Sequence, residues 1–202
     1  MSKTALLLSG GIDSAALAVW KRPDFTFTID YGQASSAGEI RAAAQIALEL
    51  GIAHELITVN CRQLGVGDLA HKEPAPNAPA SEWWPYRNQF LVTVAAMRAY
   101  ALGVSSLIVG SVKSDTFHVD GRNDFYMQLD ALLAMQEGSI HVVAPAAEMT
   151  SAELVRISGI SSGLLHWTHS CHVDEFACGC CRGCWKHTNV MEELGYGNSQ
   201  IA

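Results

Sequence analysis

ALLLSGGIDSAALAVW, residues 5–20, is the stretch of sequence that decides the fold of this chain. The apolar run at 5–8 predicts a short buried strand, the two glycines at 10 and 11 predict a turn, and the composition of 15–20 is typical of a helix. A strand that passes through a glycine turn into a helix is the opening of an α/β unit.

The same alternation continues along the chain. Further strands are predicted at 25–30, 54–59, 105–110 and 140–143, with further helices at 39–50, 89–102 and 123–136. Strands that alternate with helices imply a mainly parallel sheet, doubly wound with helices on both faces. We expect this α/β domain to occupy residues 1–160 and a small C-terminal extension to occupy 161–202.

Length and charge exclude several classes of protein. The chain has 202 residues and a net charge of −7, with only 13 Lys and Arg residues. It therefore has no basic stripe for nucleic-acid phosphates, and small-molecule chemistry is favoured. The apolar run at the N-terminus stops at the glycine turn without a cleavage site, and no stretch is long enough to span a bilayer. We expect a cytoplasmic protein with no membrane partner.

The glycine turn has the chemistry of a phosphate site. Glycine lets backbone N–H groups approach an anion closely, and the helix that follows adds its N-terminal dipole. The hydroxyls of Ser9 and Ser14 can donate to phosphate oxygens. Asp13 is placed either to cap the helix or to help hold Mg²⁺. The alternative is a tight turn with a capping Asp and no ligand.

Five of the six cysteines fall within residues 171–184. The spacing Cys171-x6-Cys178-x2-Cys181-x2-Cys184 offers four thiolates for a tetrahedral Zn²⁺ site, which would fasten the tail across the active face. Cys180 is the expected spare thiol. A redox role and an iron–sulfur cluster are the alternatives, and three nearby histidines could substitute as ligands: His169, His172 and His187.

Residues 65–87 show no periodicity, which is typical of a lid or binding loop, or of a disordered surface excursion. Its aromatic residues could hold a planar heterocycle or anchor the loop to the core. Arg87 has the fork geometry for a carboxylate or a phosphate. Asn88 could cap the helix that follows it. The expected substrate-binding residues are Trp84, Tyr86, Arg87 and Asn88, with Trp83 as a further aromatic.

Two carboxylates, Asp115 and Asp120, follow the strand at 105–110, at the edge of the sheet where a nucleotide should bind. Either could bind Mg²⁺ or the polar edge of a substrate, or be an ordinary solvated loop carboxylate. The expected catalytic residues are Asp13, Arg87, Asp115 and Asp120.

The motif SGGIDS between a strand and a helix resembles the SGGxDS signature of the PP-loop ATP pyrophosphatases. It lacks the Lys of Walker-type loops, so kinase or GTPase chemistry is not expected. The resemblance implies a fold of the adenine nucleotide alpha hydrolase type, adenylation of a carbonyl oxygen and release of pyrophosphate. It implies that ATP is bound by Ser9, Gly10, Gly11, Ile12, Asp13, Ser14, Asp30, Tyr31 and Gln33, the last three bordering the adenine and ribose.

The chain as a whole is similar to the 7-cyano-7-deazaguanine synthase (QueC) family of queuosine biosynthesis. The similarity runs through SGGIDS, DYGQ at 30–33, PYRN at 85–88, Asp120 and the cysteine cluster. It implies an ATP-dependent carbon–nitrogen ligase that converts a 7-deazaguanine carboxylate, with ammonia, through the amide to the nitrile. The implied cofactors are ATP, Mg²⁺ and Zn²⁺, and the implied assembly is a homodimer.

Two segments depart from the family pattern. Tyr86 stands where the family commonly has a small residue, and HVDG at 118–121 replaces the usual YPDC. These changes fall on the expected substrate pocket and leave the acceptor open, so one alternative is an enzyme of antiviral defence that joins the activated deazaguanine to a protein amine. Two further alternatives are a non-catalytic module that senses nucleotide or deazaguanine, and a thiol enzyme that uses Cys180 or Cys181.

Overall fold

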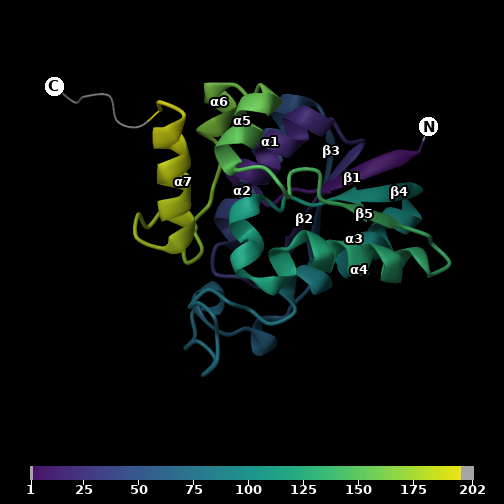
Figure 1. The fold of residues 1–202 in the computed structure, drawn as a ribbon, viewed down its shortest axis with the longest axis horizontal. Coiled ribbons are helices and arrows are strands. Elements are labelled where there is room, and N and C mark those ends of the chain that lie inside the picture. Colours follow the sequence, from purple (N-terminus) through teal and green to yellow (C-terminus); the bar gives the residue numbers. More distant parts are fainter. Residues whose placement is uncertain (1, 197–202) are drawn as a thin grey trace.

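The glycine turn joins the central strand of the sheet to the first helix, as the sequence predicts. The computed structural model describes residues 2–196 and shows a five-stranded sheet in the order β3-β2-β1-β4-β5, with every neighbouring pair parallel (Figure 1). The predicted fold class is confirmed. The strands are β1 (Lys3–Leu7), β2 (Phe25–Asp30), β3 (Ala53–Thr58), β4 (Val104–Ile108) and β5 (His141–Val143).

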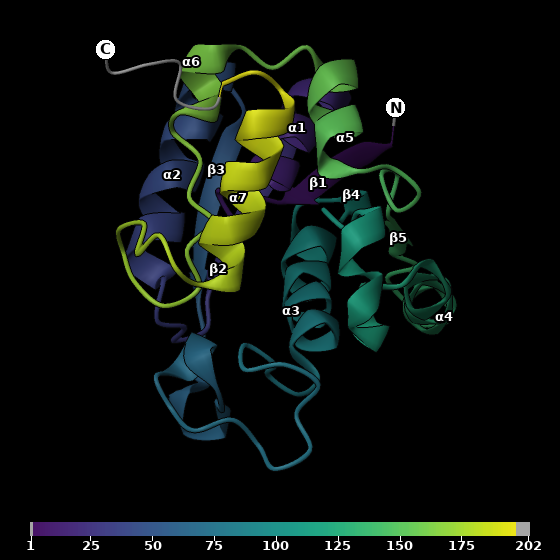
Figure 2. The same ribbon diagram turned by 60° about the vertical axis from the view of Figure 1, so that its left-hand side comes forward.

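The helices form two layers around this sheet. On one face lie α1 (Ile12–Lys21), α2 (Ser36–Leu50), α5 (Ser151–Ser158), α6 (Ser162–Leu165) and α7 (Arg182–Glu193); on the other lie α3 (Arg87–Ala101) and α4 (Asn123–Ala134) (Figure 2). Each layer has its own apolar core. Small alanines of α1 pack with Leu6 and Leu8 in the first, and Phe27 and Leu107 lie in the second.

The chain reverses its direction of winding beside β1. It runs outward from β1 through β2 to β3, then crosses back so that β4 pairs with the other side of β1. Such a switch point leaves a crevice beyond the carboxyl ends of the two strands, and open α/β sheets bind ligands there.

The long loop carries only short structure. It contains the 3₁₀ turn η2 (Asp68–Ala70), and η1 (Arg62–Leu64) comes directly before the loop. Two more turns, η3 (Lys113–Phe117) and η4 (Val119–Gly121), follow β4. The sequence analysis missed α5, although Thr150 and Glu153 form a capping box at its start, a signature that is visible in the sequence.

The C-terminal segment packs on the same core as the rest of the chain. Leu164, Leu165 and Val190 belong to the cluster that surrounds α1. Within residues 2–196, no helix combines the length and the apolar composition needed to cross a bilayer.

Candidate functional site

A cavity of 370 Å³ opens at the switch point between β1 and β4. Segments far apart in the sequence line it: the glycine turn, the end of the long loop, the turns after β4 and the cysteine segment with α7. Lining residues that carry chemistry are Ser9, Gly11, Asp13, Ser14, Tyr31, Glu39, Glu82, Trp84, Arg87, Asn88, Asp115, His118, Asp120, His172, Arg182 and Lys186.

The glycine turn needs glycine at its first position. Gly10 has φ +80°, and a Cβ there would lie 2.8 Å from both the Ala42 Cβ and the Glu39 carbonyl oxygen. Gly11 has φ −74° and lines the cavity as the N-terminal cap of α1, with no side chain capping the helix. The first N–H groups of α1 therefore meet the cavity at a helix N-terminus, where an anion is favoured.

The two serines of the turn hold its shape. Ser14 donates through Oγ to the Gly11 carbonyl at 3.0 Å, and the Ser9 and Ser14 hydroxyls lie 3.2 Å apart. Ile12 begins α1 and is buried in its core. Asp13 is in the first turn of α1 and is not its cap, so the capping alternative for Asp13 was wrong.

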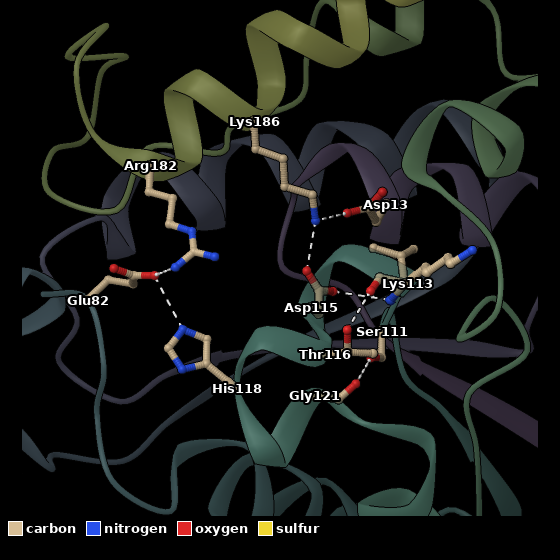
Figure 3. Close-up of polar contacts among 11 residues, drawn as sticks. Asp13, Glu82, Ser111, Lys113, Asp115, Thr116, His118, Gly121, Arg182 and Lys186 are labelled. Atoms are coloured by element: carbon tan, nitrogen blue, oxygen red, sulfur yellow. Dashed lines mark hydrogen bonds and ion pairs between the residues drawn. The ribbon is translucent and has the colours of Figure 1, made fainter. Parts of the chain in front are cut away.

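Asp13 and Asp115 share one ammonium group. Lys186 Nζ of α7 lies 2.9 Å from Asp13 Oδ2 and 2.9 Å from Asp115 Oδ1 (Figure 3). Burial raises the pKa of Asp13, and Lys186 opposes that shift. Burial alone would lower the pKa of Lys186, but the two carboxylates outweigh it and raise that pKa. The ammonium therefore stays charged between its two acceptors.

A second charged group ties three segments together across the cavity. Glu82 of the long loop accepts from Arg182 Nη1 at 2.9 Å and faces His118 Nε2 at 3.3 Å (Figure 3). Burial opposes ionisation of Glu82, but its own backbone N–H, His118 and Arg182 together lower its pKa. Arg182 also lies over the Phe117 ring, 4.4 Å from the centroid.

Arg87 lies at the start of α3, beside a group of hydroxyl and carboxyl side chains. Burial would lower the pKa of Arg87, but Tyr31, Asp120 and Glu39 raise it. Its Nε donates to Asn88 Oδ1 at 3.2 Å. Among the described residues, Arg87 has no carboxylate within ion-pair distance. Its guanidinium is thus a charged fork that lines the cavity.

The aromatic residues of the loop divide between the inside and the outside. Trp84 is buried against Tyr31, with ring centroids 5.0 Å apart and an angle of 73° between the rings. Tyr86 does not line the cavity: its side chain is 80% exposed, and its φ is +60°. Asn88 is the second residue of α3 and not its cap; its Nδ2 donates to the Asp120 carbonyl at 2.9 Å.

Asp30 and Gln33 do not line the cavity, but their side chains hydrogen-bond to residues at or next to its lining. Asp30 Oδ1 accepts from the Gly32 N–H at 3.0 Å. Gln33 is buried, accepts from the Tyr31 N–H and donates to Glu39 Oε2 at 2.9 Å. Of the segment 29–33, predicted to border the adenine and ribose, Ile29 and Tyr31 line the cavity. Glu39, which the site prediction omitted, lines it as well. Burial raises the pKa of Glu39.

The four cysteines predicted as ligands come together. The Sγ atoms of Cys171, Cys178, Cys181 and Cys184 all lie within 4.8 Å of one another, and two pairs, 178–184 and 171–181, lie 3.9 Å apart. A tetrahedral Zn²⁺ with bonds of about 2.3 Å requires sulfur atoms about 3.8 Å apart. The backbone N–H groups of His172 and Cys184 donate to Cys181 Sγ.

The other residues that the sequence offers as metal ligands lie outside the group of four cysteines. Cys180 is exposed, outside the group of four. His169, His172 and His187 line the cavity instead of joining the cysteines. Sequence reasoning missed Glu82, Arg182 and Lys186 as site residues. Arg182 lies between Cys181 and Cys184 in the sequence, and Lys186 follows Cys184 by two residues; this closeness to the cysteines was the one available signal.

A family model described as queuosine biosynthesis protein QueC matches residues 3–195. The chain belongs to the QueC family. The resemblance predicted from SGGIDS and the cysteine spacing is thereby confirmed.

Curated relatives agree along nearly the whole length of the chain. A 7-cyano-7-deazaguanine synthase of Cupriavidus pinatubonensis is 35% identical, with 96% of this chain and 96% of the relative aligned. Proteins of the same name from Desulforudis audaxviator and Acidobacterium capsulatum are 33% and 30% identical, with 96% and 95% of this chain and 98% and 92% of the relative aligned. The QueC family match includes the cysteine segment, so the cluster lies within the family's own extent.

Proposed function

We propose that this QueC-family chain is an ATP-dependent 7-cyano-7-deazaguanine synthase that uses ammonia as its nitrogen source. The observation that carries the proposal is that one cavity joins a helix N-terminus suited to phosphate with an arginine suited to a carboxylate. These are the two groups that an adenylating enzyme must bring together. The names of the curated relatives support the same reaction.

The proposed chemistry runs in two rounds. A carboxylate oxygen of 7-carboxy-7-deazaguanine attacks the α-phosphorus of ATP and expels pyrophosphate. Ammonia then attacks the acyl carbon, loses a proton and expels AMP, which leaves the amide. In the second round the amide oxygen attacks the α-phosphorus of another ATP and expels pyrophosphate. Loss of AMP and of the two amide protons then leaves the nitrile. Each round turns a poor leaving oxygen into a good one.

The roles of the protein residues follow from their positions. The N-terminus of α1, with Gly11 and Ser9, is suited to the phosphates. Arg87 is suited to the substrate carboxylate, because a guanidinium fork can donate two parallel hydrogen bonds to it. Trp84 and Tyr31 form an apolar wall against which a planar heterocycle can lie.

The side chains present fit both implied metals. Asp13 Oδ1 is buried and has no hydrogen-bond partner within residues 2–196, and it lies beside Asp115; oxygen donors of this kind suit Mg²⁺. Mg²⁺ there would neutralise phosphate charge. The tetrathiolate suits Zn²⁺ with no position left open for substrate, which makes Zn²⁺ a brace.

The placement of Tyr86 bears on the choice of acceptor. In the sequence, the bulky Tyr86 was one reason to consider a protein amine in place of ammonia. The structure puts Tyr86 outside the cavity, so this departure does not alter the described lining. The other departure, HVDG at 118–121, does reach the lining, through His118, Asp120 and Gly121. We propose ammonia as the acceptor because the curated relatives are named as 7-cyano-7-deazaguanine synthases.

The direct test incubates zinc-loaded protein with ATP, Mg²⁺ and 7-carboxy-7-deazaguanine, with and without ammonia, and identifies the products by mass spectrometry. A nitrile that forms only with ammonia supports the proposal. AMP without amide or nitrile would point to another acceptor, and nucleotide binding without pyrophosphate release would point to a sensing module.

A variant pair on α3 tests the role of Arg87. Arg87→Met is expected to raise KM for the carboxylate substrate about thirtyfold, because a charge-assisted hydrogen bond contributes about 2 kcal/mol. The control is Arg98→Met, which removes an exposed arginine that pairs with Glu55 near the other end of the same helix. Equal KM values for the two variants would remove Arg87 from the substrate site.

A further inference from the structure

The chain places one cation at the N-terminus of α1, and it comes from the far end of the sequence. Lys186 Nζ lies 2.9 Å from Asp13 Oδ2 and 2.9 Å from Asp115 Oδ1, and its side chain is 31% exposed in the cavity (Figure 3). Asp13 is in the first turn of α1, so the ammonium lies beside the site at which an anion would meet the helix dipole.

The other cations of the described lining have different surroundings. Arg182 is paired with Glu82 and lies over Phe117, and Arg87 is surrounded by Tyr31, Glu39 and Asp120. The glycine turn contains no basic residue of its own. A phosphate chain at α1 would otherwise face the carboxylates of Asp13 and Asp115, which would repel it.

We propose that Lys186 is the phosphate-binding cation of the nucleotide site. In the free protein its ammonium neutralises Asp13 and Asp115. When a divalent cation accompanies the nucleotide to these carboxylates, the ammonium donates to the β- and γ-phosphate oxygens, which become the leaving pyrophosphate. This inference deepens the proposed function and rests on its nucleotide site.

The position of Lys186 depends on the cysteine cluster. α7 begins at Arg182, and Cys181 Sγ caps it by accepting from the Cys184 N–H at 3.4 Å. Lys186 follows Cys184 by two residues and points from the first turns of α7 into the cavity. The cluster thus fixes the start of the helix that carries the phosphate contact, which assigns the tetrathiolate a role in nucleotide binding without a metal–substrate bond.

The test measures binding, so that it does not depend on turnover. Isothermal titration calorimetry would compare zinc-loaded wild type with Lys186→Met, using α,β-methylene-ATP and inorganic pyrophosphate, each with Mg²⁺. We expect Lys186→Met to weaken both about tenfold, as for the loss of a charge-assisted hydrogen bond, and to leave AMP binding within twofold of wild type. Lys186→Arg keeps the positive charge and should retain most of the wild-type affinity for both ligands.

A matched control is available at Lys113, the first residue of η3. Lys113 is exposed, outside the cavity lining and two residues from Asp115, so Lys113→Met removes the same charge without the contact. It should bind all three ligands as wild type does. Zinc content and far-UV circular dichroism confirm that each variant is folded with its metal.

Two results would overturn the inference: wild-type affinity of Lys186→Met for pyrophosphate, or an equal loss for AMP and pyrophosphate, which would show a structural effect. The outcome is separable from the proposed function. If wild type forms no nitrile but Lys186→Met loses pyrophosphate binding, the proposed function alone fails. If the nitrile forms and Lys186→Met binds normally, the role of Lys186 alone fails.

Discussion

The glycine turn and the cysteine segment face each other across one cavity, but different forces hold them. The turn is flanked by β1 and α1, whose apolar side chains lie in a fully buried core. The segment 166–181 has few buried residues and is held by four thiolates and by polar contacts, such as the His169 N–H to the Gly10 carbonyl at 2.8 Å. One wall of the site is therefore set by the hydrophobic core and the other by a group of four cysteines that could hold a metal ion.

The largest expected effect comes from removing a thiolate. Cys181→Ser should lower the bound zinc at least tenfold, because a structural site contributes about 10 kcal/mol or more and depends on all four ligands. Nucleotide binding should fall with it, while far-UV circular dichroism and cooperative unfolding of the sheet are retained. Zinc analysis and limited trypsin digestion after Arg182 or Lys186 would check this.

The control for that variant is Cys180→Ser, which removes the exposed thiol outside the cluster and should keep its zinc. If Cys181→Ser unfolded globally, the contrast between the turn and the cysteine segment would fail, because the apolar core would then also depend on the metal.

A substitution in the turn should act through the core instead. Gly10→Ala forces a side chain into a left-handed conformation and against Ala42 and the Glu39 carbonyl. We expect a loss of about 2–4 kcal/mol in the free energy of unfolding, with zinc content unchanged. Urea denaturation would measure it.

Gly11→Ala is the matched control. Its φ is −74°, and a Cβ there would have Ser9 Oγ at 3.4 Å as its nearest neighbour. Its stability should remain within about 1 kcal/mol of wild type. Equal losses in the free energy of unfolding for the two variants would show that the left-handed conformation of Gly10 is not the cause of the effect.

The contact between the two walls through Glu82 should depend on pH. Because the folded protein lowers the pKa of Glu82, the stabilisation is present above its ordinary pKa of about 4.3 and is lost as the pH falls through the lower folded value. At pH 6 the free energy of unfolding of wild type should exceed that of Glu82→Gln by about 1–2 kcal/mol, and this difference should vanish toward pH 3.

Urea denaturation between pH 3 and pH 7 would follow that difference. Glu148→Gln, at an exposed carboxyl, serves as the control and should show no comparable change. A difference between wild type and Glu82→Gln that stays constant with pH would mean that the contact does not depend on the charge of Glu82.

The smallest effect is expected at Tyr86. Tyr86→Ala should change KM for the deazaguanine substrate less than twofold, because the side chain is exposed and outside the cavity. Steady-state kinetics would measure it. A large rise in KM would place Tyr86 on the substrate in the working enzyme and would restore the importance of the departure at that position.

Much of the fold could be predicted from local patterns in the sequence. The alternation of apolar runs with helical stretches predicts the five parallel strands, and the SGGIDS turn predicts where a ligand should bind. The cysteine spacing selects the four thiolates that lie together. Such features depend on residues close in sequence, and each therefore leaves a recognisable pattern.

Only the tertiary structure decided which side chains meet in the cavity. Lys186 and Asp13 are 173 positions apart, and their contact depends on where α7 packs, beside α5. The same holds for Glu82 with Arg182, and for Trp84 turning inward while Tyr86 turns outward. The sequence determined the strand, the turn and the group of four cysteines, because local periodicity, glycine φ values and cysteine spacing are short-range properties. The packing of distant segments decided the charges that face the nucleotide site, because a side chain's direction in space depends on contacts that no local pattern records.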